Sequence, residues 1–187
     1  MIDRKPKGEI EVSGMQFETD VKACGDHHIE EEEYRSILNS DTLGRRCVMI
    51  IRKMTMDDYD EAFEMWLQTA KSGVRAIEDS REGVERFLGR NPDTSFIAEA
   101  DGRIVGVLMC GHDGRRGYIY HTAIRDPGRS RAIGGALLDA VEVAMKENGI
   151  TKIGLLIDVG NDEGAAFWAR LGWTRRDDLI YYDRVIR

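Results

Sequence analysis

The segment Tyr118-Ile-Tyr-His-Thr-Ala-Ile124, continued by Arg125-Asp-Pro-Gly128 and Arg129-Ser-Arg-Ala-Ile-Gly-Gly135, decides the fold of this chain. Its first part has the pattern of a strand, and the loop 125–131, with its proline and glycine, ends that strand. From Ile133 onward apolar residues recur at helical spacing, and Gly149 suits the position just beyond a helix end. The segment therefore predicts a strand, a tight loop and a long helix in direct succession.

The start of this helix is a candidate anion site. Backbone N–H groups in the first turn of a helix lack intrahelical partners, and the helix dipole adds partial positive charge there. Ala132, Gly134 and Gly135 let a ligand approach the backbone, while Arg129 and Arg131 supply charge for phosphate oxygens. Two interpretations stay open at this point: a nest for a pyrophosphate, or a plain connection whose small residues serve packing.

The segments around this helix complete one sheet. Before the segment, we expect a strand at Val48–Arg52, a helix after the capping box of Thr55 and Asp58, and a helix opened by Ser80 and stopped by Asn91-Pro92. Two hairpin strands follow, at Phe96–Ala100 and Ile104–Cys110, joined by Asp101-Gly102. After the long helix, we expect a strand at Ile153–Val159, a helix at Asp162–Leu171 ended by Gly172, and last strands around Trp173–Thr174 and Ile180–Ile186. Strands that first meander and then alternate with helices indicate an α+β or mixed α/β fold.

Two motifs in register carry a resemblance to a known family. Arg129-x-x-Ala132-x-Gly134 resembles the R/Q-x-x-G-x-G/A pyrophosphate loop of the GCN5-related N-acetyltransferases, the GNAT family. Further on, Asn161-Asp-Glu-Gly164-Ala-Ala-Phe-Trp168-Ala-Arg-Leu-Gly172-Trp173 resembles the family's N-x-x-A-x-x-x-Y-x-x-x-G-F/Y block. The resemblance implies the GNAT acyltransferase fold, with a mixed and mostly antiparallel central sheet flanked by helices, over residues 48–187.

The resemblance also implies an activity and a set of binding residues. It implies transfer of an acetyl group from acetyl-CoA, as co-substrate, to a primary amine of a small molecule or protein, without a metal. A neutral amine would attack the thioester directly, and backbone N–H groups near Ala123 and Ile124 would stabilise the oxyanion. The positions implied to bind acetyl-CoA are Thr122, Ala123, Ile124, Arg129, Ser130, Arg131, Ala132, Ile133, Gly134, Gly135, Asn161 and Trp168.

The chain departs from the family pattern where relatives carry an acid and a base. Ala132 replaces a glycine and Gly164 replaces a helical alanine. Trp168 stands where many relatives have the tyrosine that protonates the leaving thiolate, and an indole N–H donates a hydrogen bond but releases no proton at useful pH. Leu156 stands where relatives that acetylate ribosomal-protein N-termini have a glutamate base. Neither group therefore carries over at these positions.

His121 is the first candidate for a general base, because it lies on the central strand just before the implied splay. The alternative is a core-edge histidine satisfied by a neighbour. Strand alternation places Tyr118 and Tyr120 on the opposite face from His121, where they either line the acceptor side or pack on a helix. Trp168 completes the catalytic candidates. The remaining side chains weighed are Tyr181 or Tyr182 near the thiolate, His112 as a turn residue, and Met65 and Trp66 as core residues or as a wall of the acceptor cleft.

Residues 1–47 read as an N-terminal extension, either an arm that packs on the main domain or a partner-binding segment. They are polar, and the stretch Ile29–Leu38 predicts a helix with Tyr34, Ile37 and Leu38 on one face. A role in association, including a homodimer, is a hypothesis for this segment. His27-His28 and the following glutamates are interpreted as a solvated face rather than as a metal site.

Composition narrows the class of protein. The chain has 187 residues, 42% of them hydrophobic, which suffices for one sizeable core. Its net charge of −7 argues against nucleic-acid binding and only weakly favours a cationic acceptor. The sequence has no apolar run long enough to predict a membrane span, and its N-terminus lacks the pattern of a secretory signal. Three widely spaced cysteines without a CxxC pair fit a reducing compartment, so we expect a cytoplasmic protein.

Two functions from different classes remain after the sequence is read. The first is an acetyl-CoA-dependent N-acetyltransferase, and the second is a CoA-binding sensor or scaffold of the same fold with weak or no turnover. The feature that supports the second function is Trp168, which stands in place of the tyrosine. The acceptor amine is not readable from these residues.

Overall fold

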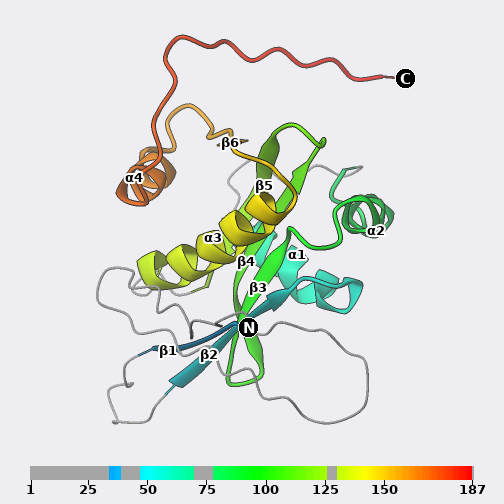
Figure 1. Cartoon of the computed structure of the whole chain (residues 1–187), viewed down its shortest axis with the longest axis vertical. Helices are drawn as coiled ribbons and strands as arrows, with labels where there is room; N and C mark the ends of the chain where they lie inside the picture. Colours follow the sequence, from blue (N-terminus) through cyan, green and yellow to red (C-terminus); the bar gives the residue numbers. More distant parts are fainter. Residues whose placement is uncertain (1–33, 39–46, 70–77, 126–129, 187) are drawn as a thin grey trace, which may run out of the picture. The chain divides into compact units, whose positions relative to one another are not determined.

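The computed structural model describes residues 34–38, 47–69, 78–125 and 130–186 (Figure 1). The chain divides into two compact units, Met1–Leu155 and Leu156–Arg187, which are described separately below. Arg129, the pair His27-His28 and most of the predicted N-terminal extension lie outside the described residues. Among the described residues, no helix has the length and apolar character needed to cross a membrane.

The first unit is built on a six-stranded sheet whose strands follow one another in chain order. The strands are β1 (Tyr34–Leu38), β2 (Cys47–Lys53), β3 (Phe96–Ala100), β4 (Arg103–His112), β5 (Gly117–Ile124) and β6 (Ile153–Leu155). Neighbours are antiparallel from β1 to β5, and only β5 and β6 are parallel. The predicted sheet, mixed and mostly antiparallel, is confirmed.

Helices cover both faces of this sheet. The one-turn helix η1 (Met56–Asp58), α1 (Tyr59–Thr69) and α2 (Arg81–Arg90) share a buried cluster with residues of β3, β4 and β5. Helix α3 (Ser130–Glu147) packs on the other face, where Figure 1 shows it crossing in front of the strands. Met65 and Trp66 of α1 are each 1% exposed, so their prediction as core residues is confirmed.

Local signals in the sequence explain where these elements begin and end. The side chain of Ser80 accepts a hydrogen bond from the Gly83 N–H at 3.2 Å and so caps the start of α2. The turn between β3 and β4 has positive φ at both central residues, 51° at Asp101 and 71° at Gly102, as a type I′ turn requires. Both features confirm the predicted boundaries.

Cys110 shows that solvent is excluded from the interior of the sheet. Its side chain is 0% exposed on β4, and burial raises the pKa of its thiol to about 12. The thiol is therefore protonated at neutral pH and is not a nucleophile. Cys110 is thus a small buried core residue, whereas the side chains of Cys24 and Cys47 lie outside the described residues.

Two predictions at the edges of the sheet are wrong. Tyr34–Leu38 forms strand β1 rather than the end of a helix, because its backbone pairs with β2 from Tyr34↔Ile51 to Leu38↔Cys47. The strand expected at Ile153–Val159 ends at Leu155, where its ladder with β5 stops. In both cases pairing with a neighbouring strand, and not local propensity, decides the structure.

The second unit contains helix α4 (Asp162–Arg170), and Gly172 follows it with φ 85°. The helix and its glycine terminator are as predicted. The strands expected around Trp173–Thr174 and Ile180–Ile186 are not formed, since residues 173–186 contain no strand. Ile180 is 80% exposed and Tyr182 is 85% exposed, so these side chains gain no packing that would order a strand.

An ion-pair network ties the start of η1 to the sheet. The Asp58 carboxylate accepts hydrogen bonds from the Arg52 guanidinium at 2.7 and 2.9 Å and from the Thr55 N–H at 2.8 Å. Burial acts to raise the pKa of the Asp58 carboxyl, but the hydrogen bonds from Arg52 and Thr55 outweigh it and leave this pKa below its usual value. The capping box predicted from Thr55 and Asp58 is thus present.

We expect Asp58→Asn to lower the free energy of unfolding by about 1–3 kcal/mol at pH 7, because it weakens charge-assisted hydrogen bonds. A depressed pKa in the folded protein contributes stability above the unfolded pKa, and that contribution is lost as pH falls through the folded value. The difference between wild type and variant should therefore shrink below about pH 4. Urea unfolding at pH 7, 5 and 3 measures it, with the exposed neighbour Asp57→Asn as control; a difference that does not change with pH would refute the assignment.

Candidate active site

Strand β5 contains a bulge at Tyr120. In its register with β4, His121 faces Met109 and Ile119 faces Cys110, so Tyr120 has no opposite residue. A bulge adds one residue to a strand, bends it and re-aims the side chains that follow. The irregularity lies in the middle of the segment that the sequence singled out.

The bulge makes one sequence prediction wrong. Tyr118 and Tyr120 were expected on the opposite face from His121. The Tyr120 ring packs instead on Phe87 of α2 at 5.0 Å between ring centroids, and His121 stacks on Trp66 of α1 at 4.7 Å. Helices α1 and α2 cover the same face, so Tyr120 and His121 project to one side despite being consecutive. Tyr118, 5.3 Å from Tyr120 between centroids, lies there too.

Beyond the bulge, β5 has a free edge. The parallel ladder between β5 and β6 runs from Gly117↔Ile153 to Ile119↔Leu155 and then stops. Residues 121–124 of β5 consequently have a strand partner, β4, on one side only among the described residues of the first unit. We call residues 121–124 the open edge. A strand with unpaired N–H and C=O groups is a template for an extended ligand.

The register shows which backbone groups face the open edge. The Arg125 N–H donates to the Val105 carbonyl at 2.9 Å, and Ala123, two residues earlier, pairs with Val107. Backbone groups alternate along a strand, so the amide of Ala123 faces β4 and those of Thr122 and Ile124 face the open edge. Ala123 is also 1% exposed. Of the three strand positions predicted to bind the co-substrate, Thr122 and Ile124 direct their backbone groups toward the open edge.

The side chain of Thr122 gives a second indication that a ligand binds along the open edge. Its hydroxyl oxygen is buried and has no hydrogen-bond partner among the described residues. Buried hydroxyl groups in native proteins nearly always have a partner, and leaving one unmade costs about 1–3 kcal/mol. An atom of a ligand lying along the open edge would provide that partner.

The start of α3 lies next to the end of β5. Gly106 of β4 pairs with Ile124, and a Cβ atom placed on Gly106 would lie 2.6 Å from the Ile133 side chain of α3. Ile133 is buried, whereas Arg131 is exposed, and a Cβ atom on Gly135 would meet nothing within 4 Å. The first turn of α3, which has no acidic residue, therefore presents its N–H groups and Arg131 at the same end of the sheet as the open edge.

His121 is held by a buried aspartate. Its Nε2 atom lies 2.7 Å from Oδ1 of Asp79, and their side chains are 14% and 6% exposed. A carboxylate only accepts hydrogen bonds, so Nε2 is assigned the hydrogen, and in the neutral imidazole Nδ1 then has the lone pair. Trp66 stacks on the imidazole at an interplanar angle of 26° and fixes its plane. This geometry suits a general base, and it equally satisfies a structural histidine.

Sequence reasoning missed Asp79. It precedes the N-cap Ser80 of α2 and is 42 residues from His121 in the chain. Its main-chain carbonyl accepts a hydrogen bond from the Tyr59 hydroxyl at 2.8 Å, which ties this segment to α1. An aspartate beside a helix cap has an ordinary capping interpretation, so nothing local in the sequence marks it as a partner of His121.

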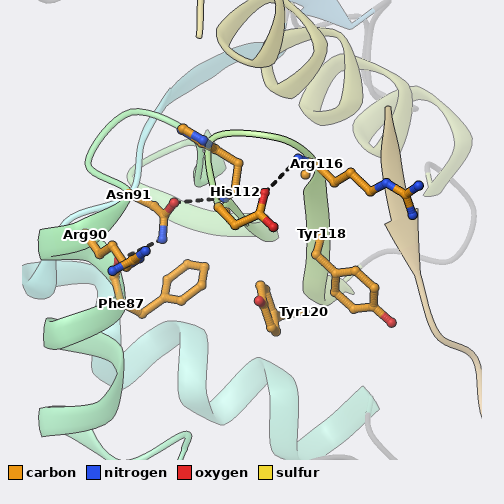
Figure 2. Close-up of a pocket in the computed structure, with 10 residues that line it drawn as sticks. Phe87, Arg90, Asn91, His112, Arg116, Tyr118 and Tyr120 are labelled. Carbon is orange, nitrogen blue, oxygen red and sulfur yellow. Dashed lines mark hydrogen bonds between the residues drawn. The ribbon is translucent and has the colours of Figure 1, made fainter. Parts of the chain in front are cut away.

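A cavity of about 400 Å³ lies between α2 and the hairpin that joins β4 to β5. Figure 2 shows Phe87, Tyr118 and Tyr120 on one side of it and the arginines Arg90 and Arg116 around it. Tyr120 is 54% exposed, and it is also the bulge residue next to His121. The cavity and the candidate base therefore meet at the bulge.

The remaining predicted site residues lie in the second unit and are described within it. The Asn161 side chain accepts a hydrogen bond from the Gly164 N–H at 2.9 Å and caps α4. Trp168 is 9% exposed and packs edge-on against Phe167 at 5.2 Å and Trp173 at 5.0 Å between centroids. In the first unit, His112 was expected as a turn residue but is the last residue of β4, where it pairs with Gly117, and its Nδ1 accepts a hydrogen bond from the Gly114 N–H at 3.1 Å in the turn that follows.

The fold and these elements can be compared with those of known proteins. The model of the acetyltransferase (GNAT) family matches residues 54–173. An acetyltransferase of Sodalis glossinidius (strain morsitans) is 30% identical over 132 residues, which are 71% of this chain and 92% of that protein. An acetyltransferase of Pectobacterium atrosepticum is 30% identical over 138 residues, 74% of this chain and 96% of that protein.

The fold recurs in solved structures. That of the aminoglycoside N-acetyltransferase AAC(6′)-Iy in complex with CoA aligns with a TM-score of 0.61 at 18% identity, over 75% of this chain and 97% of that one. At this identity the likeness concerns the fold. Together with the family match, it defines the class of the protein as an acetyltransferase. The chain belongs to the GNAT family.

Proposed function

We propose that the protein transfers the acetyl group of acetyl-CoA to a primary amine. The observation that carries this proposal is the open edge of β5 beside the start of α3. The open edge offers the backbone groups of Thr122 and Ile124 to the amides of the pantetheine arm. The first turn of α3 and Arg131 offer N–H groups and positive charge to the pyrophosphate.

The residues present fit such a co-substrate. The buried Thr122 hydroxyl lacks a partner that a ligand on the open edge would supply. A Cβ atom on Gly135 would meet nothing within 4 Å, so the helix start is not covered on that side by described residues. The structural neighbour AAC(6′)-Iy is a CoA complex, which supports the same donor here. A cytoplasmic location is part of the proposal, supported by the few cysteines and the reduced, buried Cys110.

In the proposed reaction the amine nitrogen attacks the thioester carbonyl carbon. A C–N bond forms, and the carbonyl electron pair moves to oxygen, where backbone N–H groups along the open edge, Thr122 first, stabilise the negative charge. His121 takes the amine proton on Nδ1, while Asp79 holds Nε2–H. When the C=O bond re-forms, the C–S bond breaks and CoA leaves as a thiolate. A thiolate is a tolerable leaving group, so the tyrosine that Trp168 replaces is dispensable.

We expect saturable binding of acetyl-CoA by calorimetry, and a thiol released for each acetyl group transferred to an amine. Arg131→Glu should weaken acetyl-CoA binding about 10- to 100-fold, because a charge-assisted hydrogen bond contributes about 1.5–3 kcal/mol. Arg86→Glu is the matched control, since Arg86 lies on α2, on the other face of the sheet. It should bind acetyl-CoA as the wild type does.

The possible outcomes of these experiments distinguish between the proposed functions. No saturable binding by the wild type would defeat the acetyl-CoA assignment. Equal loss in both arginine variants would show a general charge effect and remove Arg131 from the site. Binding without thiol release across amino acids, polyamines, aminoglycosides and peptides would favour the sensor or scaffold alternative.

A further inference from the structure

The cavity between α2 and the β4–β5 hairpin is lined by three aromatic residues and two arginines. Phe87, Tyr118 and Tyr120 form the aromatic side (Figure 2). Gly111 is part of the wall, and a Cβ atom there would lie 2.7 Å from the Phe87 ring and 2.8 Å from the Asn91 side chain, so glycine lets α2 sit close to the hairpin. A cavity of about 400 Å³ has the size of a site for a small molecule.

The cationic lining residues are Arg90, in the last turn of α2, and Arg116, at the end of the hairpin, and Figure 2 shows them on opposite sides of the cavity. Both residues are exposed, and among the described residues neither guanidinium has an ion pair. Two guanidinium groups at one cavity repel each other and attract an anion. Arginine is the side chain best suited to bind a carboxylate, through two parallel N–H···O bonds.

Asp113 is the one acidic residue among the side chains that line the cavity. Its carboxylate already accepts hydrogen bonds from the backbone N–H groups of Arg115 and Arg116, both at 2.8 Å. Its charge therefore serves the turn of its own hairpin. The charge that the cavity offers to a ligand is positive, although the chain as a whole carries −7.

The cavity meets the candidate base. Tyr120 lines the cavity, and the next residue, His121, projects to the same face because of the bulge. A small molecule in the cavity would thus lie near His121, where transfer requires its amine, and an anionic group on the same molecule would face the arginines that line the cavity.

We propose that the acceptor is a small amine that also bears a carboxylate, such as an amino acid with an apolar or aromatic side chain, and that Arg90 and Arg116 determine this specificity. The inference rests on the proposed function and narrows its substrate class. The aromatic side packs the body of the acceptor, and the arginines bind its carboxylate. Polycations, such as polyamines and aminoglycosides, are disfavoured by the same charges.

Three probes of one shape test the proposal: L-phenylalanine, L-phenylalaninamide and phenethylamine, with spermidine as a polycation. Thiol release from acetyl-CoA should give a kcat/KM for phenylalanine about 10- to 100-fold above those of the probes without a carboxylate. Arg90→Ala and Arg116→Ala should each remove most of this preference by raising KM for phenylalanine, whereas kcat/KM for phenethylamine, which has no carboxylate, should change far less. Arg115→Ala, on the same hairpin but outside the cavity, should keep the preference.

Binding of the probes in the presence of CoA, by saturation-transfer NMR, provides a readout that needs no turnover. Binding that depends on the carboxylate and is lost in both arginine variants supports the proposal. Equal binding or turnover of all three aromatic probes, a preference for spermidine, or a preference unchanged in the arginine variants would overturn it while acetyl transfer itself stands. Failure of the proposed function is distinct, since the wild type would then neither bind acetyl-CoA nor release its thiol.

Discussion

His121→Gln is expected to lower kcat/KM for acetyl transfer by about 10²- to 10⁴-fold, the usual contribution of a positioned general base. The glutamine amide can donate to Asp79 from nearly the place of Nε2, which lies 2.7 Å from Oδ1. It offers no lone pair of comparable basicity to the amine. The fold, the Tm and the affinity for acetyl-CoA should therefore persist while turnover is lost.

This variant distinguishes a base from a structural histidine. If His121 only joins β5 to the segment before α2, glutamine keeps that contact and turnover per folded molecule stays at the wild-type level. That result would remove His121 from the mechanism. His121→Ala breaks the contact as well, and it leaves the Asp79 carboxylate, whose side chain is 6% exposed, without this partner. It should lower the Tm in addition to kcat/KM.

Asp79 is assigned as a positioning residue, because it reaches the acceptor only through the imidazole. Asp79→Asn should lower kcat while the acetyl-CoA affinity measured by calorimetry stays unchanged. If the asparagine accepts the hydrogen bond from Nε2 through its amide oxygen, part of the activity should remain. A fall in Tm without a change in kcat would show that the pair is structural.

The elements that the sequence predicted correctly are those with local chemical causes. Ser80 caps α2 through its own side chain, and Asp101-Gly102 adopts the left-handed dihedrals of its turn without help from distant residues. Gly149 has φ 72° just after α3, as its prediction as a helix terminator requires. Such signals act within a few residues, so they can be read directly from a sequence.

The errors concern strands, whose existence depends on partners. Tyr34–Leu38 reads as part of an amphipathic helix, yet it pairs along β2. Residues 180–186 read as a strand, yet they find no partner within the second unit. Strand propensity reports a fit to a neighbouring strand and not an intrinsic preference of the backbone. Pattern alone therefore could not decide either segment.

In the candidate site, too, features with local causes could be predicted, whereas features that depend on distant residues could not. The strand, the helix start and His121 could be named because they occur in one continuous segment. The bulge could not, because it arises from the register between β4 and β5, which has no mark in either strand taken alone. Asp79 and Arg90 come from the ends of other elements and reach the site only through the packing of α2.

Gly106→Ala is expected to lower the free energy of unfolding by about 1–3 kcal/mol, the usual cost of overpacking a core. The added methyl group would lie 2.6 Å from Cγ2 of Ile133, 3.0 Å from Cδ1 of Leu137 and 3.4 Å from Cβ of Ala98. Ile133 and Leu137 are 1% and 0% exposed, so they cannot turn into solvent. Helix α3 must therefore move off β4, and its first turn moves with it. Acetyl-CoA affinity should fall together with the Tm.

Gly135→Ala is the matched control, the same change within α3 at a site where a Cβ atom meets nothing within 4 Å. It should raise the free energy of unfolding by up to about 1 kcal/mol, since alanine favours a helix interior over glycine. Each kcal/mol shifts the Tm by about 2–4 °C in a chain of this size, so calorimetry should separate the two variants clearly. Equal Tm values would contradict the close contact of Gly106 with α3.

A double-mutant cycle with Ile133→Ala identifies the contact itself. Alone, Ile133→Ala should cost about 2–5 kcal/mol, because it empties a buried site over the sheet. In the Gly106→Ala background the new methyl group fills part of that space and no longer meets Cγ2 of Ile133, so the second substitution should cost less. A coupling of about 0.5–3 kcal/mol of this sign is expected. Additive effects would mean that α3 accommodates the methyl group elsewhere, and the start of α3 would then not depend on Gly106 for its position beside the open edge.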